Sequence, residues 1–271
     1  MGNIIELPRA KELEESVSAL RRAAAEAICA NISLVYVEGK AIEMNYRLAF
    51  GELEIAILDT YCRTLRLRRK REVILGQITR QAPRSVKILE AQLDEELARY
   101  EGELLRKKRL VEEARQWEKH PRGVVKEGAM KAQFTAVILA LHPDIRPEKS
   151  DLRLLNDAAD AYIDGDGQKL RRLRKDVRAD DDELPLGGLI DEEKRLMDLV
   201  QDLEAENGAV QIRAPFTMRA NVEEEEARRA WREQLEGELE SNRRRLAEEE
   251  VALANMMKLA KRLENKSLKE N

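Results

Sequence analysis

The chain has little of several residue types, and each shortage limits what kind of protein it is. Aromatic residues make up 4% of its 271 residues, and there are only 13 Gly and 7 Pro. So few aromatic side chains do not favour a large globular core, and so few helix-breaking residues favour long helices. Runs of roughly 18 apolar residues, the length of a membrane span, are lacking, and so is the pattern of a secretory signal. We therefore expect a cytoplasmic protein with no membrane association.

Cysteine and histidine are scarce as well. Cys29 and Cys62 are the only cysteines, and His120 and His142 are the only histidines. Two cysteines inside apolar helical patterns do not make a disulfide framework, so we predict that both are reduced packing residues. The sequence has no zinc-ligand spacing, no glycine-rich phosphate loop and no nucleophile elbow. We predict that the chain binds no metal, needs no cofactor and is not an enzyme.

Charge is abundant but balanced. Charged residues reach 38%, and 49 basic against 53 acidic side chains leave a net charge of −4. A field this weak would not attract nucleic acid, so no nucleic-acid partner is expected. The run Arg63 to Arg71 holds six Lys or Arg in nine residues. Leucines interleave with these cations, which favours a helix face that is solvated or paired with acidic helices over one that contacts phosphates.

Apolar residues recur at steps of three and four, which predicts an all-α fold built from long coiled-coil helices. The expected helices cover residues 9–30, 41–81, 86–118 and 222–263. Ala82-Pro83 ends the second helix, so the third should fold back antiparallel to it. On the last helix Asn242 lies in the apolar seam, whereas Glu249 is an exception to it.

Two shorter segments leave more than one interpretation open. Residues 32–37 are rich enough in β-branched and aromatic residues for a short strand, although a helix-to-helix connection fits them better. A helix that includes Leu189, Leu196 and Leu203 is expected to stop near Asn207-Gly208, where both residues favour a left-handed cap. We divide the chain into consecutive regions: residues 1–119 (N-terminal helical), 120–178 (a turn-rich module), 179–189 (an acidic linker) and 190–271 (C-terminal helical).

The turn-rich module contains the tripeptide His142-Pro143-Asp144, which follows an apolar helical stretch. Pro143 should stop that helix and leave the tripeptide exposed at the tip of a helical hairpin. There Asp144 could accept a charge-assisted hydrogen bond from a partner's arginine. The two facing apolar surfaces of the hairpin consist of Phe134, Val137, Ile138 and Leu141 on one helix and Leu155, Ala158, Ala161 and Tyr162 on the other.

This segment resembles a J domain, in which a His-Pro-Asp tripeptide joins two antiparallel helices and an aromatic residue stands eight positions before it, as Phe134 does here. The resemblance covers residues 124–175 and includes the Ala161-Tyr162 to Gly165-Asp166 junction. It implies that His142, Pro143 and Asp144 contact a DnaK-type chaperone and promote its ATP hydrolysis. Lys131 and Arg146 are nearby cations that we expect to take part in binding the partner.

The sequence leaves two hypotheses open. In the first, the chain is a J-domain-like co-chaperone or adaptor whose coiled-coil arms bind a client or form a homodimer. In the second, it is a structural coiled-coil protein whose hairpin is a spacer. The second is favoured by the small number of basic residues on the helix before the tripeptide, where J domains usually carry several. Asp164 to Gln168 also resembles the start of a calcium loop, but Lys169 and Lys175 occupy required positions, so a helix-to-helix turn fits better.

Overall fold

The computed structural model describes residues 6–80, 86–119, 127–177 and 185–270, and within these ranges the chain forms helices and no strand. The all-α prediction is confirmed. Residues 32–37 belong to helix, so the short strand considered for them was wrong. None of the helices in the described ranges combines the length and apolar character that crossing a bilayer requires.

The chain forms two compact units, and each combines segments that are distant in the sequence. Unit 1 consists of Met1–Glu43 and Trp117–Arg219, and unit 2 of Met44–Gln116 and Ala220–Asn271. This grouping differs from the four consecutive regions expected from the sequence. The reason is long-range packing: the first helix buries its apolar face against helices that come more than 100 residues later.

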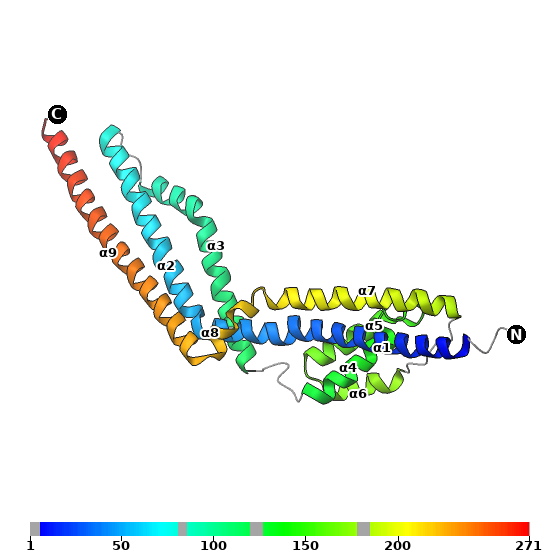
Figure 1. Cartoon of the computed structure of the whole chain (residues 1–271). Helices are drawn as coiled ribbons and strands as arrows, with labels where there is room; N and C mark the ends of the chain where they lie inside the picture. Colours follow the sequence, from blue (N-terminus) through cyan, green and yellow to red (C-terminus); the bar gives the residue numbers. More distant parts are fainter. Residues whose placement is uncertain (1–5, 81–85, 120–126, 178–184, 271) are drawn as a thin grey trace. The chain divides into compact units, whose positions relative to one another are not determined.

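Unit 1 contains two long helices that run side by side, α1 (Glu6–Ile32) and α7 (Leu186–Gln211) (Figure 1). Val17 of α1 packs with Leu189 and Leu196 of α7. Ser16 of α1 bonds Glu193 of α7, while Ala27 further along α1 accepts a 2.9 Å hydrogen bond from Asn207. The contact residues have increasing numbers on both helices, from Ser16 with Glu193 to Ala27 with Asn207, so the two helices are parallel.

The start and end of α7 differ from the sequence expectation. The acidic linker was expected to reach residue 189, but α7 begins at Leu186, and Leu189 is buried. At the other end, the helix continues through Asn207-Gly208 to Gln211. The Asn207 amide donates to the Ala27 carbonyl and accepts from Asn31, each at 2.9 Å. Because the Asn207 amide bonds α1, it does not compete for the backbone hydrogen bonds of its own helix.

Four short helices complete most of unit 1: α4 (Glu127–Leu141), the 3₁₀ turn η2 (Pro147–Lys149), α5 (Leu152–Ile163) and α6 (Gly167–Asp176). Helix α4 packs against α1, and α5 and α6 pack against α4 and each other (Figure 1). The three α-helices share one hydrophobic core with Ala24, Ile28 and Cys29 of α1. Cys29 is a buried free thiol, as predicted. Burial raises its pKa, so the thiol stays protonated and unreactive at neutral pH.

A π-helix, η1 (Ser33–Glu38), follows α1 directly. The N–H of Gly39 donates to the carbonyl of Leu34, five residues back. A Cβ at Gly39 would lie 2.8 Å from that carbonyl oxygen and 3.4 Å from a side-chain carbon of Pro215, so only glycine fits there. Leu34 and Ile42 pack with Phe216 of the 3₁₀ turn η3 (Phe216–Met218).

Unit 2 is built from parts of α2 (Gly39–Arg80), α3 (Val86–Lys119) and α8 (Arg219–Glu223), together with α9 (Glu225–Glu270). Ion pairs connect Arg66 of α2 to Glu90 and Glu54 of α2 to Lys107, so α2 and α3 are antiparallel. Trp231 of α9 donates to Tyr46, and Glu249 pairs with Arg71. Helix α9 is therefore parallel to α2, so an antiparallel arrangement does not describe all of the long helices.

The buried face of α9 follows the seam expected from its sequence. Its most buried positions alternate at steps of four and three: Leu235, Leu239, Asn242, Leu246 and Leu253. Glu249, the exception in this seam, forms a two-point ion pair with Arg71 at 2.8 and 3.1 Å. The seam thus accepts one acidic residue because α2 supplies its counter-charge.

The basic run of α2 is fully paired. Each of its six cations has a carboxylate partner within the described residues: Arg63 with Glu250, Arg66 with Glu90 and Asp94, Arg68 and Arg69 with Glu72, Lys70 with Glu90, and Arg71 with Glu249. These partners hold the pKa of Arg66 above and that of Glu90 below their usual values. The interpretation of this run as a paired helix face is confirmed.

Candidate partner-binding turn

The tripeptide His142-Pro143-Asp144 lies in a turn directly after α4. The last helical bond runs from the His142 N–H to the Ile138 carbonyl at 2.9 Å, and Pro143 has no N–H with which to continue the ladder. The His142 carbonyl then accepts the N–H groups of Ile145 at 3.0 Å and Arg146 at 2.8 Å. The turn is therefore held by backbone hydrogen bonds on both sides of the proline.

The helices on either side of the turn, α4 and α5, pack through the apolar faces named from the sequence. Phe134 and Tyr162 stack with ring centroids 4.7 Å apart and planes inclined by 17°. Offset stacking at this distance stabilises a pair beyond its burial alone. All eight residues of the two faces lie in one core: Phe134, Val137, Ile138, Leu141, Leu155, Ala158, Ala161 and Tyr162.

Two aspartates cap the helices that follow the turn. Asp151 accepts the backbone N–H groups of Arg153 and Leu154 at the start of α5. Asp166 does the same for Gln168 and Lys169 at the start of α6, and Gly165 has a φ of 75°. Gly165 thus ends one helix and Asp166 caps the next, as a helix-to-helix turn requires. Because the Asp166 carboxylate binds backbone N–H groups, this junction is a helix-to-helix turn.

The three residues of the tripeptide differ in exposure. The Asp144 side chain is 62% exposed, whereas the His142 side chain is 19% exposed. His142 Nδ1 lies 3.3 Å from the Asp144 N–H, which donates to it, and 3.7 Å from the Asp144 carboxylate. Burial lowers the pKa of His142, and the Asp144 carboxylate partly opposes that shift. At neutral pH the imidazole is thus neutral and accepts the Asp144 N–H.

Arg195 of α7 also contacts this turn, and no sequence pattern pointed to it. Its Nη1 atom donates to the Asp144 carbonyl at 2.6 Å. Glu192 holds the same guanidinium through two hydrogen bonds, of 2.8 and 3.0 Å, and pairs with the buried Arg21 at 3.1 Å. These bonds lower the pKa of Glu192 and raise that of Arg195. The Arg195 and Asp144 positions are 51 residues apart in the chain, so local sequence patterns predict only the Glu192–Arg195 pair.

The two cations expected to assist binding are placed differently. Lys131 is exposed on α4, three residues before Phe134. Arg146 is only 3% exposed, so its side chain does not lie on the surface, and its expected role in binding a partner stays a prediction. His120 lies outside the described residues.

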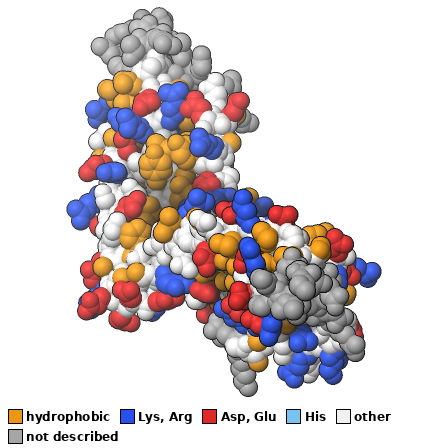
Figure 2. Space-filling model, turned by 45° about the vertical axis from the view of Figure 1, so that its right-hand side comes forward, with side chains coloured by type: hydrophobic (Ala, Val, Ile, Leu, Met, Phe, Trp, Pro, Cys, Tyr) orange, Lys and Arg blue, Asp and Glu red, His pale blue; other side chains and the backbone are white. Residues whose placement is uncertain are grey.

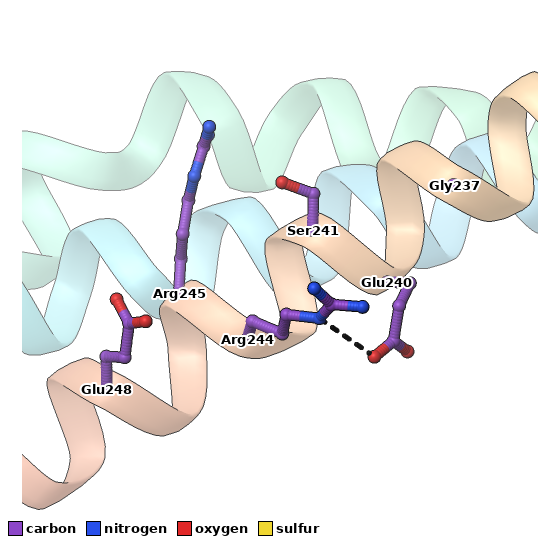
Figure 3. A pocket seen from close by; sticks show the side chains of 6 residues that line it. All are labelled: Gly237, Glu240, Ser241, Arg244, Arg245 and Glu248. Atoms are coloured by element: carbon purple, nitrogen blue, oxygen red, sulfur yellow. Dashed lines mark hydrogen bonds and ion pairs between the residues drawn. The ribbon is translucent and has the colours of Figure 1, made fainter.

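A shallow hollow lies on α9 in unit 2. It measures about 410 Å³ and is lined by Gly237, Glu240, Ser241, Arg244, Arg245 and Glu248 (Figure 3). Arg244 pairs with Glu240 at 3.3 Å. All lining residues come from one exposed helix face, and the Ser241 hydroxyl has no histidine near it in the lining that would act as a base. The described residues also contain no cluster of three or more potential metal ligands.

Comparisons with known proteins leave this turn without a counterpart. No family model, no curated protein and no solved structure matches the chain.

Proposed function

We propose that the chain is a J-domain-like co-chaperone or adaptor that recruits a DnaK-type chaperone ATPase through His142-Pro143-Asp144. The supporting observation is the presentation of Asp144, whose side chain is 62% exposed at the end of two helices that bury a shared core. A carboxylate placed in this way can accept a bidentate hydrogen bond from an arginine on another molecule. The backbone bonds around Pro143 fix the turn before the partner arrives, which reduces the ordering cost of binding.

His142 has a positioning role in this proposal. Its Nδ1 atom accepts the Asp144 N–H, so the imidazole orients the backbone that carries the exposed carboxylate. Pro143 ends α4 and keeps the carboxylate away from the helix surface. Lys131, exposed on the same helix, adds positive charge to the surface that an acidic partner would meet.

The long helices of unit 2 are the proposed arms for client binding or self-association. They expose several large apolar side chains: Tyr61, Leu75, Tyr100, Val251, Met257 and Leu259. Figure 2 shows hydrophobic side chains gathered along this unit. Exposed apolar surface of this kind marks protein contacts. A homodimer through these helices is one form of the proposal, and light scattering would detect it. The proposal places the chain in the cytoplasm as a non-enzymatic protein without nucleic-acid or membrane partners.

A structural role without chaperone activity is the second candidate, and two observations favour it. Lys131 is the only Lys or Arg on α4, so the helix before the tripeptide offers little positive charge. Arg195 of the same chain already donates to the Asp144 carbonyl. In this alternative the turn is an internal contact between α7 and the α4–α5 hairpin, and the hairpin is a spacer.

Single-turnover ATP hydrolysis by the DnaK-type chaperone of the same organism separates the two candidates. We expect the unmutated chain to accelerate hydrolysis, and His142→Gln and Asp144→Asn to lose most of that acceleration. Asp160→Asn is the matched control, because it removes the same charge from an exposed position on α5. Acceleration should persist in the control. An unmutated chain that leaves hydrolysis unchanged would reject the co-chaperone and leave the structural role.

A further inference from the structure

Helix α6 carries more positive charge than the acidic side chains of the described residues pair with. Five of the seven residues from 169 to 175 are Lys or Arg. Leu170 is fully buried, and Leu173 packs against the core of unit 1, so the inner face of the helix is apolar. The outer face is exposed and consists of Arg171, Arg172, Arg174 and Lys175, here called the α6 basic face. Figure 2 shows Lys and Arg side chains gathered at the lower edge of the unit that carries α6.

Most of these cations have no carboxylate partner among the described residues. Lys169 pairs with Asp157 of α5 at 3.2 Å, and Arg171 donates to the backbone carbonyl of Gly167 at 3.2 Å. Within the part of the chain that the structure describes, no Asp or Glu forms an ion pair with any residue of the α6 basic face. The basic run of α2 differs in this respect, because each of its six cations has such a partner.

The missing counter-charge has an energetic consequence. Arg171 and Arg174 are three residues apart, as are Arg172 and Lys175, so like charges lie side by side on one helix surface. Such pairs destabilise a helix by a few tenths of a kcal/mol each, about as much as opposite charges would stabilise it. An anionic partner would remove this repulsion and gain charge-assisted hydrogen bonds from three guanidinium groups.

The helix is also rigidly mounted. Leu170 belongs to the same core as Phe134, Lys169 is tied to α5, and the Gly167 Cα faces the Met130 side chain on α4. A Cβ at Gly167 would lie 3.5 Å from the Met130 sulfur, which is ordinary contact distance. A surface fixed in this way does not have to be ordered when a partner binds.

We propose that the α6 basic face binds a carboxylate-rich segment of another protein. Ten residues of helix span about 15 Å, a length that a short acidic segment matches. Nucleic acid fits less well, because α6 has no aromatic residue on which a base could stack, and a net charge of −4 does not attract an extended polyanion. Arginine also binds carboxylates through two parallel hydrogen bonds, which suits a partner rich in Asp and Glu. This surface is separate from the tripeptide turn, so it does not depend on chaperone recruitment.

Fluorescence anisotropy with labelled oligo-glutamate at low salt tests the proposal on the full chain. The variant R171Q/R172Q/R174Q/K175Q should bind at least about tenfold more weakly, because each exposed ion pair contributes modestly and four are lost. Glutamine keeps a helix propensity close to that of arginine, so α6 should persist. The matched control is R63Q/R68Q/R106Q/R115Q, which changes the net charge equally at exposed helix positions of unit 2 that already have acidic partners.

Equal affinities of the two fourfold variants, or no binding by the unmutated chain, would overturn the proposal. So would tighter binding of duplex DNA carrying the same charge as the oligo-glutamate, since that result would assign the face to nucleic acid. Circular dichroism checks that the helices persist. If the α6 variant loses helicity, the single variants Arg172→Gln and Arg174→Gln are compared with Arg63→Gln and Arg68→Gln. Each α6 change should then weaken binding about twofold to threefold, and neither control should.

Discussion

The two units of this chain bury their apolar residues in different ways. In unit 1 side chains from α1, α4, α5 and α6 converge on one core, where Phe134, Ile138 and Leu170 are completely buried. In unit 2 the buried residues are spread along helices, as with Leu239 and Leu246 on α9, and ion pairs accompany them. A core position therefore depends on neighbours from several helices, whereas a seam position depends on few. Similar residue types therefore form a compact core beneath the tripeptide turn in unit 1 and extended helical surfaces in unit 2.

The largest expected effect comes from deleting the same side chain in each unit. Leu170→Ala, at a fully buried core position, should lower the free energy of unfolding by about 3–5 kcal/mol. Leu246→Ala, at a seam position that is 8% exposed, should cost about 2–3 kcal/mol, because the surrounding helices can close around the smaller residue. Urea unfolding measures the losses, and hydrogen exchange locates them. Equal losses in the two variants would contradict the distinction between core and seam.

A smaller effect is expected from changing glycines in unit 2, where α2 and α3 pack closely at Gly51. A Cβ at Gly51 of α2 would lie 2.4 Å from a methyl group of Val111 on α3, whereas Gly102 of α3 has open space around it. Gly51→Ala should therefore destabilise the chain by about 1–2 kcal/mol through overpacking. Gly102→Ala should stabilise it by about 0.5–1 kcal/mol, since alanine is the better helix former. Thermal unfolding of both variants gives the signs, and a stabilising Gly51→Ala would show that α2 and α3 are loosely packed there.

The smallest expected effect is a pH dependence that separates the units. The pKa of His142 is lowered in the folded chain, so the unfolded chain binds a proton first as the pH falls below about 6.5. Unit 1 should lose stability from that pH towards the lowered pKa. Glu90 in unit 2 and Glu192 in unit 1 also have lowered pKa values, but their contributions are complete above about 4.5 and disappear only below it.

Hydrogen exchange of α4 and α3 amides, measured from about pH 7 to below pH 4.5, separates the titration of His142 from that of the two glutamates. The loss between pH 6.5 and 4.5 should occur in α4 alone and should vanish in His142→Gln. Glu90→Gln is the control, because it changes a group that titrates only in the lower window. A loss in that upper window that survives in His142→Gln would assign the titration to another group.

Local features of the fold could be predicted from the sequence, and long-range ones could not. Periodicity identified the long helices and the two apolar faces that meet at Phe134 and Tyr162. The helix-to-helix turn expected over Asp164 to Gln168 was found, with Gly165 and Asp166 forming it. The pairing of α1 with α7, the parallel directions and the Arg195 contact depend on residues that are far apart in the chain, so no local pattern encodes them. Asn207 misled the prediction because its amide bonds α1 and does not cap its own helix.

The π-helix after α1 has a consequence for how this chain tolerates change in length. A turn closed by a bond to the fifth residue back contains one residue more than an α-helical turn, so the next residues of the helix face about 100° away from where unbroken α-helical winding would place them. That rotation brings Ile42 into line with Leu34 and Phe216. Removing one residue between 35 and 38 would restore regular α-helical winding and leave Ile42 seven residues after Leu34, a spacing that keeps both on one face. A one-residue deletion should therefore be tolerated better in this stretch than in a regular α-helix, where it would turn the residues that follow by about 100°.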